Sequence, residues 1–168
     1  MNYVLRSQMP NHELMPEYHG ETYVGFLDVS GFTKMILENK KRAGHVLDDF
    51  YGTIYQTVYT ANFEEPTTQA KFNAVVVSDS AVLFLSQHND GESNNVSRTE
   101  GLPIILGNIK KMNRRFLDLP FMTTCSIAYG EFEYQNRKDA LYVCRFFRGL
   151  VSSFHSLVTN NLAKTKKN

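Results

Sequence analysis

The stretch "VGFLDVSGFTKM" (residues 24–35) places one carboxylate, Asp28, at the end of an apolar run and follows it with a turn of small residues. The β-branched and aromatic residues of 22–29 predict a buried strand that ends at Ser30-Gly31. An acid between a strand and a helix is often only a cap or a turn residue. Asp28 alone therefore leaves a structural role and a chemical role equally open.

Helical spacing begins at Gly31 and continues to about Phe63, and Gly44 is the expected break between two helices. The tyrosines at 51, 55 and 59 follow this spacing, so we interpret them as core or dimer-surface residues. Two β-rich runs follow at 71–77 and 81–86, joined by "SDS" (78–80). Ser and Asp stabilise tight turns, so we predict a hairpin with Asp79 at its tip.

The remaining segments complete the order β-α-β-β-α-β. We expect a solvated loop over 87–101, a helix over 102–117, two strands over 122–135 that meet at a kink or turn at Gly130, and a helix over 140–158. This order predicts an α+β fold, a ferredoxin-like sandwich with an antiparallel sheet and helices packed on it. We divide the chain into an irregular leader (1–20), one domain (21–158) and a basic solvated tail (159–168).

Composition excludes several classes of protein. The 168 residues carry a formal net charge of +1, which argues against a protein that coats nucleic acid or an anionic membrane. No run approaches the roughly 20 apolar residues of a membrane span, and the N-terminal stretch lacks the apolar middle of a secretory signal. We therefore expect a cytoplasmic protein. Cys125 and Cys144 lack metal-site spacing, so we interpret them as buried thiols.

Strand order suggests that Asp28 and Asp79 meet at one end of the sheet. Two converging carboxylates repel each other unless a cation lies between them, and hard divalent ions take such oxygen ligands together with substrate phosphates. The carbonyl of Val29, at the end of the strand, is a further candidate ligand. The turn "SGFT" (30–33) adds a glycine and a helix start, which favour a bound anion. The sequence thus predicts metal and triphosphate in one corner.

Three motifs carry a resemblance to a known family. "FLDVSGFTKM" (26–35), "VVVSDSAVLFL" (75–85) and "SIAYGEFEY" (126–134) resemble the catalytic domain of class III nucleotidyl cyclases, which have a ferredoxin-like sheet decorated with helices. The first motif is the most specific. The second departs from the family pattern, because Ser78 stands where the family usually has Gly.

The resemblance implies a reaction and a role for each matching residue. A nucleoside triphosphate would be converted to a 3′,5′-cyclic nucleotide and pyrophosphate by two-metal catalysis, with two Mn²⁺ or Mg²⁺ ions. Asp28 and Asp79 would hold the ions and Val29 would lend its carbonyl. The nucleotide would be contacted by Phe26 and by the turn residues Ser30, Gly31, Phe32 and Thr33.

The residue at position 75 bears on which base of the nucleotide would be recognised. Purine-specific members place Lys or Glu four residues before the second Asp, and Val75 occupies that position here. The chain therefore resembles the small pyrimidine cyclases of Pycsar antiphage systems, whose cyclic UMP or cyclic CMP acts on a neighbouring effector. We expect UTP as the substrate, so that the enzyme is a uridylate cyclase.

The C-terminal part does not match the family. Members work as homodimers in which an Asn and an Arg from the second chain complete each site, but "RKDALYVCRFFRGLVSSFHSLV" (137–158) lacks that pattern. Arg145 and Arg148 are cations of this segment, yet their spacing does not identify either as a replacement. The alternative is a catalytically degenerate module for dimerisation or nucleotide sensing. A haloacid-dehalogenase phosphatase needs a second Asp at Ser30, and an RNA-recognition domain needs aromatic and basic strand motifs that are missing.

Overall fold

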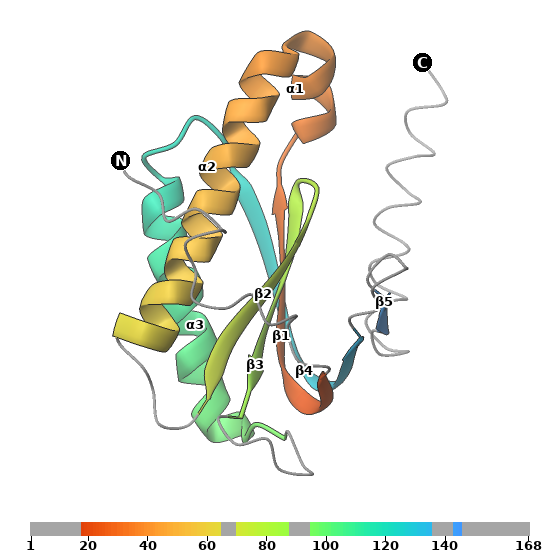
Figure 1. The fold of residues 1–168 in the computed structure, drawn as a ribbon, viewed down its shortest axis with the longest axis vertical. Helices are drawn as coiled ribbons and strands as arrows, with labels where there is room; N and C mark the ends of the chain where they lie inside the picture. Colours follow the sequence, from red (N-terminus) through yellow and green to blue (C-terminus); the bar gives the residue numbers. More distant parts are fainter. Residues whose placement is uncertain (1–17, 65–69, 88–94, 136–142, 146–168) are drawn as a thin grey trace.

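The computed structural model describes residues 18–64, 70–87, 95–135 and 143–145 (Figure 1). One antiparallel sheet, in the order β2-β3-β1-β4-β5, carries two long helices on one face. Its elements are β1 (Tyr18–Val29), α1 (Phe32–Glu38), α2 (Lys40–Tyr59), the π-helical turn η2 (Thr60–Glu64), β2 (Lys71–Val77), β3 (Ser80–Ser86), α3 (Arg98–Phe116), β4 (Thr123–Gln135) and β5 (Val143–Arg145). The predicted ferredoxin-like α+β sandwich is confirmed, since β1 lies between β3 and β4 as that fold requires.

The first half of the chain differs from the prediction at two boundaries. β1 begins at Tyr18, inside the stretch expected to be an irregular leader, because residues 18–20 pair with β4. The expected helix break at Gly44 is wrong, since Gly44 lies within α2. The break falls at Asn39, whose extended backbone (φ −156°) separates the two helices and whose side chain accepts a hydrogen bond from the Arg42 amide. Asn is a favoured residue at this capping position.

The second half differs in three elements. α3 begins at Arg98, within the stretch predicted to be a loop. β4 is a single strand that continues through Gly130, rather than two strands. The helix predicted over 140–158 is wrong at Val143–Arg145, which pair with β4 as β5, and the rest of that segment lies outside the described residues. Among the described helices, none is both long and apolar enough to cross a membrane.

The main core lies between the sheet and the long helices. Alternate residues of β1 face this side, and they pack against the apolar stripes of α2 and α3. Phe50 of α2 is fully buried and stacks on Phe116 of α3, with ring centroids 5.8 Å apart. This packing fixes α2 relative to the ends of the central strands, where Asp28 and Asp79 lie.

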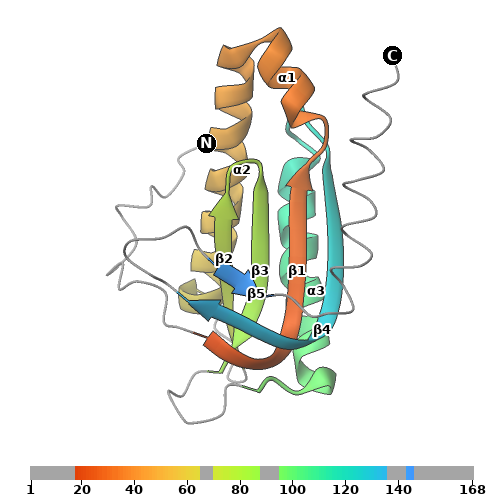
Figure 2. The same ribbon diagram turned by 90° about the vertical axis from the view of Figure 1, so that its right-hand side faces the viewer.

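A second apolar cluster covers part of the opposite face. Figure 2 shows the second half of β4 curving across this face, so that the start of β1 and the end of β4 fold back over β3. Phe84 of β3 lies 5.0 Å from Phe132, 5.5 Å from Tyr18 and 6.1 Å from Tyr134, measured between ring centroids. The four rings are almost completely buried. The other end of this face, toward the C-terminus of β1, carries Asp28.

On the edge strand β2, a side chain makes the hydrogen bonds that a neighbouring strand would otherwise make. Asn62 of η2 donates through Nδ2 to the Phe72 carbonyl (2.8 Å) and accepts through Oδ1 from the Phe72 amide (2.9 Å). Phe72 is buried, with 1% of its surface exposed. Both backbone groups would lose their partner without this amide, and unpaired groups at an edge attract other strands.

Asn62→Ala is therefore expected to lower the free energy of unfolding by about 2 kcal/mol, because the buried amide and carbonyl of Phe72 lose their hydrogen bonds. Urea denaturation followed by circular dichroism measures this change. Asn113→Ala, at an exposed position on α3, is the matched control and should leave stability nearly unchanged. Equal losses in both variants would contradict the role of Asn62.

Candidate functional site

Asp28 lies at the last but one position of β1 and is held by the neighbouring strand. In the β1–β3 ladder it pairs with Ser80. The Ser80 hydroxyl donates to Asp28 Oδ1 at 2.6 Å, across 52 residues of sequence. Asp28 is half-buried. A short hydrogen bond to a carboxylate is a strong one, so Ser80 orients this acid at the open end of the sheet.

Asp79 lies next to Ser80, in the two-residue turn between β2 and β3. The Val29 amide donates to the Asp79 carbonyl at 2.9 Å, which fastens the turn to the end of β1. The amide and carbonyl of one residue in an antiparallel strand point to the same neighbour, so the Val29 carbonyl is also directed toward this turn. The structure thus brings Asp28, Val29 and Asp79 to one end of two adjacent strands. Figure 1 shows this end of β1 and the β2–β3 turn at the top of the sheet.

The turn after β1 offers fewer groups to a bound anion than the sequence predicts. Gly31 has φ +75°, and a Cβ built on it would meet nothing within 4 Å, so this backbone is open to a ligand. Thr33 is exposed. The Ser30 amide, however, donates to the Met122 carbonyl at 2.8 Å. Phe32 is buried in the helix-side core. The amide of Ser30 and the side chain of Phe32 are therefore not available to a nucleotide, whereas amides in the first turn of α1 are.

The residues expected near the base lie on the face opposite the helices. Phe26 is half-buried and belongs with Asp28 to that face of β1. Val75 of β2 has 5% of its surface exposed and packs in the second apolar cluster. A buried valine offers no hydrogen bond to a purine edge, so the position that would read a purine carries only apolar contact.

Tyr51 is a site residue that the sequence did not identify. Its hydroxyl donates to the Ser78 carbonyl at 2.8 Å, so α2 is tied to the turn that carries Asp79. Partial burial is the main cause that raises the pKa of the Tyr51 hydroxyl, followed by the neighbouring Tyr55 and the Asp79 carboxylate. The helical spacing of Tyr51 is that of any core residue, and no local signal marks it. The role of Ser80 could have been predicted, because the two-residue turn places it directly after Asp79, at the start of the strand expected to lie beside Asp28.

The chain has the fold of class III nucleotide cyclases. It superimposes on the guanylyl cyclase Cya2 with a TM-score of 0.56 and 12% identity, over 82% of this chain and 69% of that one. It also matches a class III adenylyl cyclase-like ATP-binding protein from Pseudomonas aeruginosa, with a TM-score of 0.54 and 10% identity over 85% of this chain and 32% of the other. No protein-family model and no curated protein matches the sequence.

The donor set of this class III-like fold suits Mg²⁺ or Mn²⁺. Two carboxylates and a strand-end carbonyl are hard oxygen ligands, and such ions take one or two carboxylates together with substrate phosphates and water. Within the described ranges, no group of three or more His, Cys, Asp or Glu side chains converges. Two carboxylates would not fill the coordination shell of such an ion, so a site built on Asp28 and Asp79 would leave positions for substrate phosphates and water.

Other candidates from the sequence lie elsewhere. Cys125, predicted to be a buried thiol, is an exposed residue of β4, although partial burial of its sulfur raises the pKa of the thiol. Cys144 and Arg145 lie in β5, next to the Glu133–Gln135 end of β4. Arg148 falls outside the described residues. Neither arginine is thereby assigned to the site.

Proposed function

We propose that the chain is a nucleotide cyclase that converts a nucleoside triphosphate to a 3′,5′-cyclic nucleotide and pyrophosphate. The observation that supports this most is a pair of hydrogen bonds at the end of β1, from the Ser80 hydroxyl to Asp28 and from the Val29 amide to the Asp79 carbonyl in the β2–β3 turn. It occurs in a fold shared with a guanylyl cyclase. The Asp28 carboxylate is thus oriented, and the backbone of Asp79 is held, before any ligand binds, which is the kind of arrangement that electrostatic catalysis requires.

Different residues of the chain would bind the metal ions and the phosphates for an in-line displacement. Asp28, Asp79 and the Val29 carbonyl would hold two Mn²⁺ or Mg²⁺ ions, which when bound favour deprotonation of the ribose 3′-hydroxyl and offset charge on the α-phosphate. The open backbone at Gly31 and the first amides of α1 would bind the phosphates. The 3′-oxygen forms a bond to the α-phosphorus, the bond from that phosphorus to the bridging oxygen breaks, and pyrophosphate leaves.

UTP is the substrate that we propose. The position that reads a purine in related cyclases carries Val75, which is buried, and Phe26 provides an aromatic face nearby on the same side of the sheet. A product such as cyclic UMP would act as an alarm signal in antiphage defence, through an effector that binds the cyclic nucleotide. We also propose a homodimer, because class III cyclase sites are completed by a second chain.

Purified protein incubated with Mn²⁺ and each of the four nucleoside triphosphates is expected to form most product from UTP, with pyrophosphate released in equal amount. Mass spectrometry identifies the cyclic nucleotide, and omission of the metal should abolish it. Assays over a range of protein concentrations test whether activity depends on dimers. Tight nucleotide binding without turnover would favour the degenerate sensing module, and a cyclic purine product would overturn the assignment of the base.

A further inference from the structure

The turn that carries Asp79 has an unfavourable backbone conformation. Ser78 has φ +55°, and among the described residues it is the one non-glycine residue with a positive φ. It occupies the first central position of a two-residue hairpin turn between Val77 and Ser80, where glycine is preferred when φ is positive. A Cβ disfavours this conformation, so contacts from outside the turn must help to maintain it.

Two hydrogen bonds hold the peptide groups on either side of Asp79. The carbonyl of Ser78, which belongs to the peptide group before Asp79, accepts from the Tyr51 hydroxyl at 2.8 Å. The carbonyl of Asp79 itself, in the following peptide group, accepts from the Val29 amide at 2.9 Å. Fixing both peptide planes fixes the direction in which the Asp79 side chain leaves the backbone. The bond from the Val29 amide is a contact between neighbouring strands that any hairpin at this place would have. The bond from the Tyr51 hydroxyl comes from a side chain and is specific to this residue.

Tyr51 provides this support from a rigid base. It follows Phe50, which is fully buried in the helix-side core, and it packs partly against the same core. The hydroxyl therefore projects from an ordered helix and not from a loop. A phenol is protonated at neutral pH, and partial burial raises the pKa of Tyr51 further above its ordinary value, so the hydroxyl remains a donor.

We propose that Tyr51 is a positioning residue, which holds the Ser78–Asp79 turn so that the Asp79 carboxylate is presented to divalent cations. The inference rests on the proposed function, because it assumes that Asp79 is a metal ligand. It explains how this chain uses Ser78 where glycine would be the simpler choice. The Tyr51 hydrogen bond and the left-handed Ser78 should then be energetically coupled.

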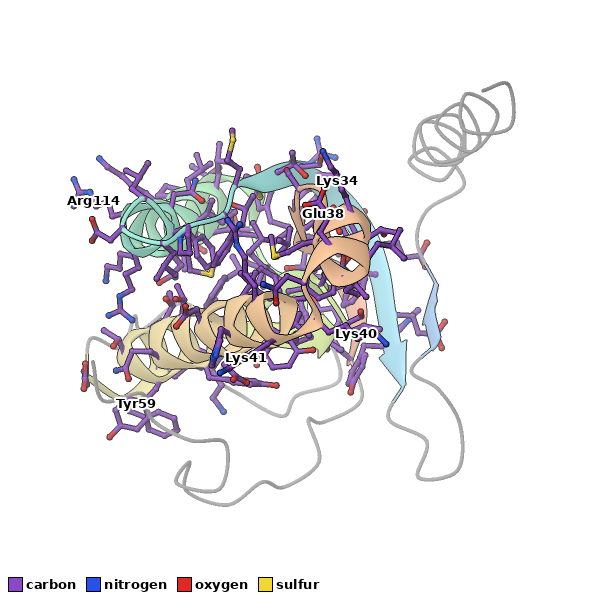
Figure 3. The ribbon with its side chains drawn as sticks, turned by 90° about the horizontal axis from the view of Figure 1, so that it is seen from above. Lys34, Glu38, Lys40, Lys41, Tyr59 and Arg114 are labelled. Atoms are coloured by element: carbon purple, nitrogen blue, oxygen red, sulfur yellow. The ribbon has the colours of Figure 1, made fainter. Side chains whose placement is uncertain are left out.

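The test measures Mn²⁺ binding, by the electron paramagnetic resonance signal of free Mn²⁺, without nucleotide. Tyr51→Phe removes only the hydroxyl and is expected to weaken Mn²⁺ binding about fivefold, the size of effect for one net hydrogen bond. Tyr59→Phe is the matched control. Tyr59 is the last residue of α2, at the end of the helix opposite Lys40 (Figure 3), and its ring packs on Phe63. This variant should bind Mn²⁺ like the wild type.

Ser78→Gly tests the coupling. Glycine adopts the positive φ without strain, so the double variant Tyr51→Phe/Ser78→Gly should recover most of the lost Mn²⁺ affinity. A merely structural hydroxyl would lower the melting temperature of Tyr51→Phe and leave Mn²⁺ binding unchanged, and that result would overturn the proposal. Equal Mn²⁺ affinity in Tyr51→Phe and Tyr59→Phe would do the same.

The design separates this inference from the proposed function. If wild-type protein binds no Mn²⁺, or if Asp79→Asn binds it as tightly as the wild type, the metal site itself is wrong. If Asp79→Asn loses Mn²⁺ while Tyr51→Phe keeps it, the site stands and Tyr51 has no positioning role.

Discussion

Asp28→Asn is expected to reduce cyclic nucleotide formation by roughly a thousandfold or more, because one of the two carboxylates loses its charge. The substitution preserves shape. In the wild type, the Ser80 hydroxyl donates to Asp28 Oδ1 at 2.6 Å. The amide oxygen of asparagine can accept the same hydrogen bond. The fold should therefore survive while the chemistry fails. The rate of product formation at saturating UTP and Mn²⁺ measures the effect.

Asp118→Asn is the control, because Asp118 is an exposed acid in the segment that follows α3. It makes the same change of charge at a residue outside the proposed metal site and should keep full activity. The melting temperature of Asp28→Asn, compared with that of the control, shows whether the protein is folded. Activity within tenfold of the wild type in a folded Asp28→Asn protein would contradict the two-carboxylate mechanism.

Phe84→Ala is expected to have the largest effect on stability, a loss of about 3–5 kcal/mol in the free energy of unfolding. Phe84 has 2% of its surface exposed and contacts the rings of Tyr18, Phe132 and Tyr134. Its removal leaves a cavity beneath the curved end of β4, on the face without helices. Urea unfolding followed by circular dichroism gives the change.

Two comparisons make this result specific. Phe63→Ala removes a ring that is 57% exposed and should cost far less. Phe84→Leu keeps most of the apolar volume and should cost less than alanine. A change below about 1 kcal/mol for Phe84→Ala would mean that the second cluster does not stabilise the sheet.

The central part of the fold was predictable because its signals are local. Runs of β-branched and aromatic residues predicted β1 and the β2–β3 hairpin, and the order of the elements predicted the sheet. The helix break was not predictable in this way. A glycine costs a helix about 1 kcal/mol, yet α2 continues through the exposed Gly44. Asn39 ends one helix and caps the next, a role that its own side chain decides.

The second apolar cluster needed information from distant strands. Phe132 and Tyr134 show the alternation of any strand with one buried face. What buries them is the curvature of β1 and β4 over β3, which depends on a long ladder between two segments far apart in sequence. The three-residue strand β5 is likewise defined by its partner and not by its own residues.

The site was predictable to a similar extent. The placement of Asp28 and Asp79 at one end of the sheet followed from strand order, and Ser80 was within reach of the same argument. The accessibility of the β1–α1 turn was not, since the contact between the Ser30 amide and Met122 joins segments that lie far apart in the sequence. Tyr51 also depends on how α2 crosses the sheet, which periodicity does not specify.

The position of β1 in the sheet has a consequence for biosynthesis. Its partners on both sides are made much later, since Asp28 pairs with Ser80 and Val29 with Thr123. A ribosome adds about 5–20 residues per second, so this 12-residue strand waits roughly 5–20 s for its second neighbour. During that interval an apolar segment with two bare edges is exposed on the nascent chain. Slower growth at low temperature, or a chaperone that shelters emerging strands, should therefore increase the yield of soluble protein.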